Sequence, residues 1–352
     1  MTDKEKEAKT LLDKIINKSR LHLYKPIQVA EVLYKDRLEG IDFDDTSSFV
    51  NPSKQWRDAI SHFLVKSVCS SSDSYQKALF RSEMPIEQLK VLSDINRRTR
   101  GGVEAYIYRL FENRFNTMVD ALNYCSYHNQ TNFQIQDFLN IFFSSKELKK
   151  SVDKIYEIVV YALFSALVDC LNIQITLSSN EAKSEILKEF SDFAEQVIGL
   201  SEHRHSITIP ANIHRMGVTN AADGGLDMWS SFGLAIQIKH IDLDEESAKK
   251  IVESITADRI VIVCRDADKN VIISLLNQIG WKARIQGVVT EKRLILWYEK
   301  ALRGKYSDQL GNKIINIILS QIQREFPSAD NSFTTFWNSR MYKIESIPAG
   351  WT

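Results

Sequence analysis

The sequence predicts an α/β protein, with a mixed central sheet flanked by helices and a mainly α-helical N-terminal region. Two observations support this prediction. Over residues 1–150 the apolar positions mostly recur at helical spacing, whereas over residues 151–352 helical stretches alternate with short runs of branched residues. A chain of 352 residues is long enough for two such parts, each with its own core. We therefore expect a domain boundary near residue 150.

Helical periodicity dominates the first part. The stretch from Lys4 to Leu23 has apolar positions three and four residues apart, as does GGVEAYIYRLFENRFNTMVDALNYCSYH at residues 101–128. In the second stretch Val103, Tyr106 and Ile107 share one face. Turn-rich segments such as FDDTSSFVNPSKQ and SSSDS separate the helices.

Alternating helices and strands follow residue 150. Helices are predicted over Val152–Cys170, over Ala182–Ile198, at NVIISLLNQIG and from Glu291 onward. The predicted strands, all rich in branched residues, are NIQITLS, SITIP, LDMWSSF, GLAIQIKHI, RIVIVCRD and ARIQGVV. This alternation is typical of a sheet covered by helices.

Composition excludes several classes of protein. With 44% hydrophobic and 26% charged residues, the chain is neither disordered nor fibrous. The 45 basic and 45 acidic residues cancel, yet a DNA-cutting protein can combine acidic metal ligands with a basic cleft, so net charge does not decide the partner. The four cysteines lack zinc-ligand spacing, the start MTDKEKEAKT is charged, and the run IVVYALFSALV is too short to span a bilayer. We expect a cytoplasmic protein.

The chemistry concentrates between residues 220 and 246. Asp227 opens one short strand, and the next strand carries Gln237 and Lys239, which point to the same face because they lie two residues apart. If the two strands form a hairpin, Asp227 lies beside that pair. Three polar groups would then converge at one edge of an apolar sheet.

This convergence suits the hydrolysis of a phosphodiester. Oxygen ligands suit Mg²⁺, which lowers the pKa of a bound water and neutralises charge on the phosphate. Asp227 would supply a carboxylate, Gln237 an amide oxygen and Ile238 a main-chain carbonyl. Lys239 would position the attacking water or stabilise the negative charge on phosphorus.

Asp227 followed by GLAIQIKH resembles the PD-(D/E)xK nuclease motif, with LD in place of PD and Gln-Ile-Lys in place of Glu-x-Lys. Beyond the motif, segments from MTDKEKEAKTLLDKIINKSR to KIYEIVVYALFSALVDCLNIQITLS resemble the HaeII restriction endonuclease family. The resemblance implies a dimeric, Mg²⁺-dependent type II restriction endonuclease that cuts double-stranded DNA at the palindrome purine-GCGC-pyrimidine. It also implies a partner DNA methyltransferase that protects host DNA without having to bind this protein.

The glutamine is the main departure from the motif. It removes one negative charge, so the site should bind a metal more weakly than two carboxylates would. Glu157, on the helix before the core, restores a carboxylate if that helix packs against the hairpin, although a surface role is the alternative. Asp223 competes with Asp227 as first ligand, but it lies in the turn AADGG, where an Asp often only shapes the chain.

Two segments are candidates for DNA contact. Arg97, Arg98 and Arg100 precede two glycines at a predicted helix start, where arginine can bind guanine or phosphate; a solvated basic loop is the alternative. Arg215 and Asn220 lie just before Asp227 and could contact the DNA near the cut. The pair His203 and His205 lacks a third ligand, and His240 should face away from the site by strand alternation.

Two classes of function remain at this stage. The first is the restriction enzyme; the second is a non-catalytic DNA-binding protein on a degenerate nuclease core, with a repair or junction nuclease as a variant of the enzyme class. Lys239 favours an enzyme, since a decayed site has no reason to keep it. A palindromic target implies a two-fold homodimer, formed through the N-terminal helices, to which we assign recognition or dimerisation, or through GNKIINIILSQIQREF in the catalytic part.

Overall fold

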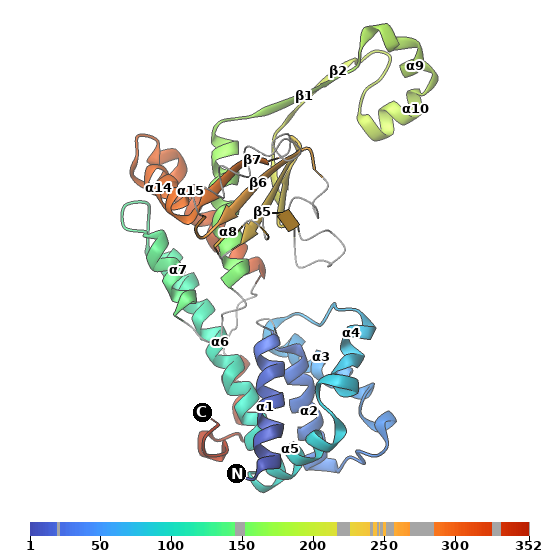
Figure 1. Cartoon of the computed structure of the whole chain (residues 1–352), viewed down its shortest axis with the longest axis vertical. Helices are drawn as coiled ribbons and strands as arrows, with labels where there is room; N and C mark the ends of the chain where they lie inside the picture. Colours follow the sequence, from blue (N-terminus) through green and yellow to red (C-terminus); the bar gives the residue numbers. More distant parts are fainter. Residues whose placement is uncertain are drawn as a thin grey trace. The chain divides into compact units, whose positions relative to one another are not determined.

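The computed structural model describes residues 1–19, 22–144, 152–216, 226–239, 242–244, 246, 249–250, 257–267, 285–325 and 332–351. The chain forms two compact units. Unit 1 comprises Met1–Tyr127, Gln136–Ile155 and Leu319–Thr352, and unit 2 comprises His128–Ile135 and Tyr156–Ile318. Helices build unit 1, and unit 2 holds the sheets, which confirms the predicted α/β class (Figure 1). The functional division into 1–150 and 151–352 stays a prediction; residues from Leu319 onward group with the N-terminal helices.

Most helices of unit 1 pack around an apolar cluster that is formed by residues between Ala8 and Phe115 and between Phe336 and Trp351. The helical elements with most of their residues in this unit are α1 Asp3–Lys18, α2 Tyr24–Glu39, η1 Thr46–Ser48, α3 Pro52–Val65, α4 Asp73–Ala78, η2 Leu79–Glu83, α5 Ile86–Arg98, α6 Gly102–Tyr127, α7 Ile135–Phe143, α16 Ser332–Ser339 and η6 Ile344–Ser346.

Helix α1 shows how the sequence sets these boundaries. A capping box between Thr2 and Glu5 starts the helix, with Thr2 N donating to Glu5 Oε2 at 2.8 Å. The predicted helix ran to Leu23, but α1 ends at Lys18, because Ser19 adopts extended backbone and Leu23 has a φ of 47°. The predicted helix over residues 4–23 is therefore too long at its C-terminal end, and Leu23 is the N-cap of α2.

A buried polar network ties α2, α5 and α6 to the C-terminal residues. Glu104 accepts hydrogen bonds from Arg37 Nε at 2.9 Å and Nη2 at 3.0 Å, from Asn96 Nδ2 at 2.6 Å and from Tyr342 Oη at 2.7 Å. Glu104 itself is fully buried. Its negative charge is thus matched by a guanidinium and two further donors inside one unit.

Unit 2 follows the predicted alternation closely. Its elements in chain order are α8 Val152–Cys170, β1 Gln174–Ser178, η4 Glu181–Lys183, α9 Ser184–Glu189, α10 Ser191–Phe193, η5 Ala194–Ile198, β2 Ser206–Pro210, β3 Ile213–Arg215, β4 Met228–Ser230, β5 Leu234–Lys239, β6 Arg259–Cys264, β7 Ile285–Thr290, α14 Glu291–Arg303 and α15 Ser307–Glu325. Helix α8 has the predicted bounds, although its first four residues, like the last seven of α15, belong to unit 1. The helix predicted at NVIISLLNQIG lies outside the described residues.

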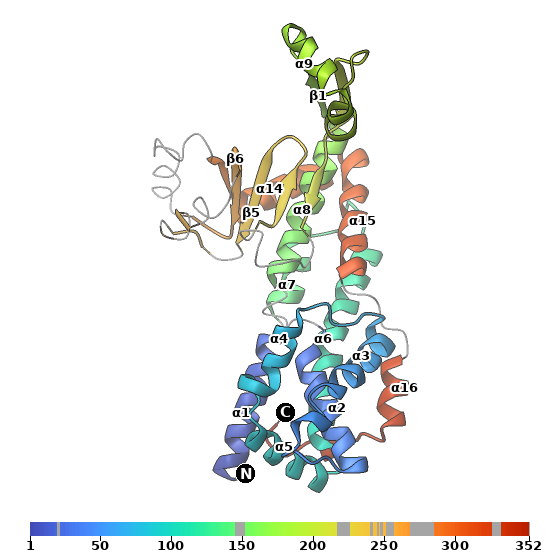
Figure 2. The same cartoon turned by 90° about the vertical axis from the view of Figure 1, so that its right-hand side faces the viewer.

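The main sheet has the order β3-β4-β5-β6-β7. Strands β3, β4 and β5 pair antiparallel, whereas β5, β6 and β7 pair parallel, so the sheet is mixed as predicted. Ala235, Ile260, Ile262 and Cys264 share one buried cluster over the central strands. Helices α8 and α14 are joined by a hydrogen bond of 2.7 Å from Tyr298 Oη to the Val159 carbonyl. Figure 2 shows β5 and β6 edge-on beside α8.

Strands β1 and β2 form a separate two-stranded sheet. The segment between them was predicted as one helix over Ala182–Ile198, and the structure corrects this to short 3-10, α and π segments. Helices in proteins are held mainly by packing of an apolar face. Here that face is exposed, at 54% for Phe190 and 68% for Val197, so within the described residues it has little packing to hold one continuous helix. Within the described part of the chain, no helix is long and apolar enough to cross a membrane.

Candidate active site

Strands β4 and β5 form the hairpin that the sequence predicts. Met228 pairs with Ile236 and Trp229 with Ala235, and this register continued by one step sets Asp227 opposite Gln237. The turn between the strands includes Gly233, whose φ of 80° lies in the region that favours glycine. Ser230 Oγ secures the turn by accepting a hydrogen bond from Leu234 N at 2.9 Å. The hairpin therefore fixes the position of Asp227 relative to β5.

Asp227 and Gln237 are in direct contact. Asp227 Oδ2 accepts one hydrogen bond from Gln237 Nε2 at 2.6 Å and another from the Ile238 main-chain N at 2.7 Å. Asp227 is half-buried, while Gln237 is 3% exposed and Ile238 6%. Both donors are uncharged, so these bonds orient the carboxylate without neutralising it.

Lys239 lies one step further along the same face of β5. It pairs in register with Cys264 of β6, as Gln237 pairs with Ile262, so both side chains point to one side of the sheet. Lys239 is half-buried, and it makes no hydrogen bond or ion pair with any residue that the structure describes. Its ammonium group is thus available to an anion that approaches this face.

Glu157 and Arg215 form a buried ion pair instead of lining this face. Arg215 Nη1 lies 3.8 Å from Glu157 Oε2, and their side chains are 6% and 10% exposed. Arg215 is the register partner of Met228, which pairs with Ile236. Paired residues share a face. Arg215 therefore points to the side of the sheet opposite Asp227, and its contact with DNA stays a prediction.

The remaining predicted positions near the hairpin in the sequence are residues without a described position and the pair His203 and His205. Asn220, Asp223 and His240 lie outside the described residues. His205 Nδ1 lies 3.2 Å from Ser179 Oγ. Among the residues with described positions, no three His, Cys, Asp or Glu side chains cluster as a metal site.

Two of the three arginines before α6 form ion pairs within unit 1. Arg97 and Arg98 end α5, where Arg97 Nε donates to the buried Asp36 at 2.8 Å and Arg98 Nη2 donates to Glu5 at 2.8 Å. Arg100 is exposed and has a φ of 54°. Helix α6 begins at Gly102, as predicted. Arg97 and Arg98 are thus held by acidic side chains, whereas Arg100 is exposed.

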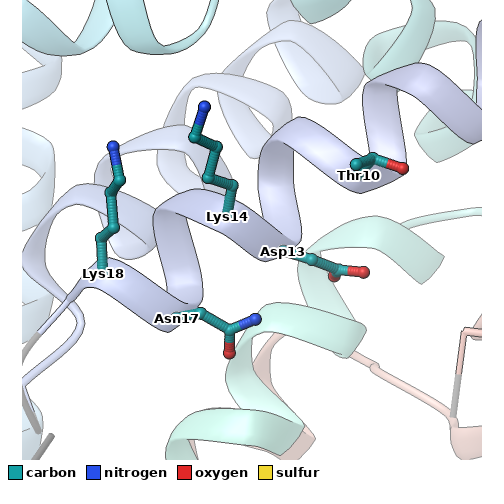
Figure 3. Close-up of a pocket in the computed structure, with 5 residues that line it drawn as sticks. All are labelled: Thr10, Asp13, Lys14, Asn17 and Lys18. Atoms are coloured by element: carbon teal, nitrogen blue, oxygen red, sulfur yellow. The ribbon is translucent and has the colours of Figure 1, made fainter.

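A pocket also lies along α1 in unit 1, lined by Thr10, Asp13, Lys14, Asn17 and Lys18 (Figure 3). The Asp13 carboxylate accepts hydrogen bonds from Lys9 Nζ at 2.6 Å and Tyr106 Oη at 2.7 Å. The pocket contains none of the residues of the Asp227 hairpin. We assign it no part in the chemistry.

The donor set at the hairpin fits a hard divalent cation. A carboxylate, an amide side chain and a main-chain carbonyl at Asp227, Gln237 and Ile238 all offer oxygen. The 2.6 Å hydrogen bond from Gln237 Nε2 to Asp227 Oδ2 holds the first two side chains next to each other. Only one of the three is a carboxylate, so the site carries less negative charge than a two-carboxylate centre.

Sequence comparison identifies the family. The model of the HaeII restriction endonuclease family matches residues 8–342. The chain belongs to the HaeII restriction endonuclease family. The type II restriction enzyme NgoBI of Neisseria gonorrhoeae is 51% identical over 98% of this chain and 99% of its own length. The type II restriction enzyme HaeII of Haemophilus aegyptius is 48% identical over 95% and 96%, respectively. No solved structure matches.

Family membership confirms the predicted enzyme class. The protein is a type II restriction endonuclease, a site-specific deoxyribonuclease of a restriction-modification system. Enzymes of this class bind double-stranded DNA and generally use divalent metal ions. The expectation of a non-catalytic DNA-binding protein gains no support from these relatives.

Proposed function

We propose that this enzyme cleaves double-stranded DNA at the palindrome purine-GCGC-pyrimidine, using Mg²⁺ held by Asp227, Gln237 and the Ile238 carbonyl. The recognition sequence rests on the family resemblance. The metal site rests on one observation, the 2.6 Å contact between Asp227 and Gln237 on the face that also carries Lys239. This arrangement is that of a PD-(D/E)xK nuclease with glutamine at the second ligand position.

The residues of the hairpin have distinct tasks in this proposal. The Ile238 N–H holds the Asp227 carboxylate in place, so that its oxygen is oriented before DNA binds. Gln237 offers an oxygen once its amide group turns by half a rotation about its last side-chain torsion, which exchanges the positions of nitrogen and oxygen. Mg²⁺ bound there would lower the pKa of a water and neutralise charge on the phosphate.

Lys239 contributes positive charge where negative charge develops. Its ammonium group is a compact point charge that can donate to the attacking water or to a phosphate oxygen. The half-buried position makes that charge more effective than it would be in bulk water.

Glu157 keeps a supporting role in the proposal. Its carboxylate is paired with Arg215, and this pair connects α8 to β3, the edge strand beside the hairpin. Ligation of a metal by Glu157 would require that pair to separate. We therefore assign Glu157 and Arg215 first to positioning the strands of the site.

A homodimer completes the proposed function. Each chain provides one Asp227 hairpin, and a cut through both strands of a palindrome needs two sites related by a two-fold axis. Arg98 and Arg100 are proposed DNA contacts that are exposed in the structure, and Asn220, which lies outside the described residues, is a third. A partner methyltransferase protects the host's own sites. Arg97 can contact DNA only if its ion pair with Asp36 separates.

The test is cleavage of plasmid DNA by the purified protein with and without MgCl₂, followed by sequencing of the ends. We expect discrete fragments that end at purine-GCGC-pyrimidine and no cutting in excess chelator. Ends at another sequence would overturn the recognition site but not the metal site. Cutting that persists in chelator would overturn the metal site.

The role of Lys239 is tested by substitution. Lys239→Ala should reduce the cleavage rate at least about 10³-fold while specific DNA binding stays within a few-fold of the wild type. Lys292→Ala, which removes an exposed lysine of α14, is the matched control and should cut normally. Loss of DNA binding by Lys239→Ala would assign this lysine to recognition instead.

A further inference from the structure

The β1–β2 ribbon with the helical segments at its end forms an arm, residues 171–211, that has an unusual surface (Figure 1). Its strands pair Ile175 with Ile209 and Leu177 with Ile207, so these four side chains share one face. The other face is polar, with Thr176 and Thr208 hydrogen-bonded at 3.0 Å. The ribbon thus has the alternation of a sheet that is buried on one side.

Among the residues that the structure describes, none buries that apolar face completely. Leu177 and Ile209 are each 40% exposed, and Ile175 and Ile207 are half-buried. A two-stranded ribbon alone is marginally stable in water, and an amphipathic one gains stability when its apolar face is covered.

The helical end of the arm carries a second apolar stripe. Ile186, Phe190, Phe193 and Val197 recur at helical spacing in the sequence, and in the structure they lie along the short helical segments between Ser184 and Ile198. Their exposed fractions are 54%, 54%, 52% and 68%. Such a stripe ordinarily packs against a core. Here it faces solvent throughout.

The charge of the arm argues against DNA as the occupant of these surfaces. Six acidic residues stand against three basic ones, a net charge of −3 with histidines neutral; they are Glu181, Glu185, Glu189, Asp192, Glu195 and Glu202 against Lys183, Lys188 and Arg204. A DNA backbone attracts basic surfaces and repels acidic ones. An apolar surface with this charge fits a protein partner.

The exposed area matches the requirement of a dimer. Nine large apolar residues of the arm are at least 37% exposed, namely Leu171, Ile173, Leu177, Ile186, Phe190, Phe193, Val197, Ile198 and Ile209. Together they expose roughly 900 Å², and a standard stable interface buries about 800 Å² on each partner.

We propose that the arm is the dimerisation element of this enzyme and that its apolar surfaces pack against the arm of a second copy. This inference rests on the homodimer of the proposed function and names the surface that forms it. A two-fold dimer uses the same patch on both copies. The interface would replace the two earlier candidates, the N-terminal helices and the α15 segment.

The decisive measurement is the mass of the full-length protein in solution, by light scattering and sedimentation velocity over a range of concentrations. The wild type should be a dimer at micromolar concentration. Phe193→Glu combined with Val197→Glu should raise the dimer dissociation constant at least about 100-fold, because each change occurs twice in the interface. Leu177→Glu, on the apolar face of the ribbon, should weaken the dimer as well.

Matched controls separate the arm from a general effect of added charge. Ser178→Glu adds the same charge on the polar face of the same ribbon, and Leu296→Glu replaces an apolar side chain of α14 that is 58% exposed. Both should remain dimeric. All variants should keep the circular dichroism spectrum of the wild type, since the altered residues are exposed.

Three outcomes would overturn the dimerisation inference. A monomeric wild type would do so, as would arm variants that stay dimeric, or a Leu296→Glu variant that alone becomes monomeric. Arm variants that stay dimeric but lose DNA binding would assign the arm to DNA. Because mass is measured without DNA, a dimer that fails to cut the proposed palindrome would refute the proposed function and leave the arm interface standing.

Discussion

Two carboxylates, Glu104 in unit 1 and Asp227 in unit 2, are held in contrasting ways. Glu104 is fully buried and bound by the Arg37 guanidinium, Asn96 and Tyr342. Asp227 is half-buried, and the Gln237 amide and a main-chain N–H hold it. Removing one partner of a buried ion pair leaves an uncompensated charge, so the fold depends on the Glu104 network being complete. A carboxylate near the surface that accepts hydrogen bonds from these neutral donors is suited to bind a cation.

The largest effect is expected from Asp227→Asn. Asparagine keeps an oxygen that can accept the hydrogen bond from Ile238 N, so the fold should survive, but it removes the charge that binds the metal. We expect the single-turnover cleavage rate at saturating DNA to fall at least about 10³-fold with an unchanged midpoint of thermal unfolding. A rate within tenfold of the wild type would show that another carboxylate, such as Asp223, is the ligand.

The matched change in unit 1 should act on stability instead. Glu104→Gln leaves the Arg37 guanidinium, whose side chain is only 18% exposed, without its counter-charge. We expect the free energy of unfolding in urea to fall by about 3–5 kcal/mol, while the cleavage rate per folded molecule stays near that of the wild type. The double variant Arg37→Gln, Glu104→Gln should recover part of the loss. A slow but stable Glu104→Gln enzyme would contradict the comparison.

The sequence predicted the hairpin well because its determinants are local. Alternation in β5 placed Gln237 and Lys239 on one face, and the short turn before Leu234 brought Asp227 opposite Gln237. Local pattern also gave α8 its bounds. These features depend on neighbours within about a dozen residues, so a single sequence is enough to predict them.

Other features depend on partners that are distant in the sequence. The ion pair of Arg215 with Glu157, on a helix about 60 residues earlier in the chain, is not visible in the local pattern, and the contact of Arg215 with DNA stays a prediction. Arg97 looked like part of a basic loop, and its partner Asp36 lies 61 residues away. The helix predicted over Ala182–Ile198 is instead a series of short segments, whose large apolar side chains are exposed among the described residues. The spacing of apolar residues predicts that a helix has an apolar face, but it does not predict which residues pack against that face.

A tenfold effect is expected from Gln237→Glu, which makes the site a two-carboxylate centre. Without metal, the new carboxylate would face Asp227 where the 2.6 Å hydrogen bond was, so the midpoint of thermal unfolding should fall. With Mg²⁺ the added charge should strengthen binding, and the MgCl₂ concentration for half-maximal cleavage should drop about tenfold. Glu157→Gln is the comparison for a carboxylate outside this contact. Equal metal requirements for wild type and Gln237→Glu would count against ligation by residue 237.

The smallest expected effect is on the pH dependence of stability, and it should change unit 1 without changing cleavage at the Asp227 site. Burial lowers the pKa of His22 below its ordinary value, although Glu325 opposes the shift. His22 is therefore neutral in the folded protein at pH values where the unfolded chain binds a proton. The stability that this provides is present above the ordinary histidine pKa of about 6.5 and is lost as the pH falls through the folded-state pKa.

The variant His22→Gln removes this titration. The free energy of unfolding in urea, measured between pH 7.5 and 5, should decline less steeply for the variant than for the wild type, while the cleavage rate at pH 7.5 stays the same in both. His22 belongs to unit 1, whose buried charges we assign to stability, so a change in cleavage would contradict that assignment. Identical slopes for the two proteins would mean that His22 takes up its proton equally well when folded, against the desolvation expected for a buried ring.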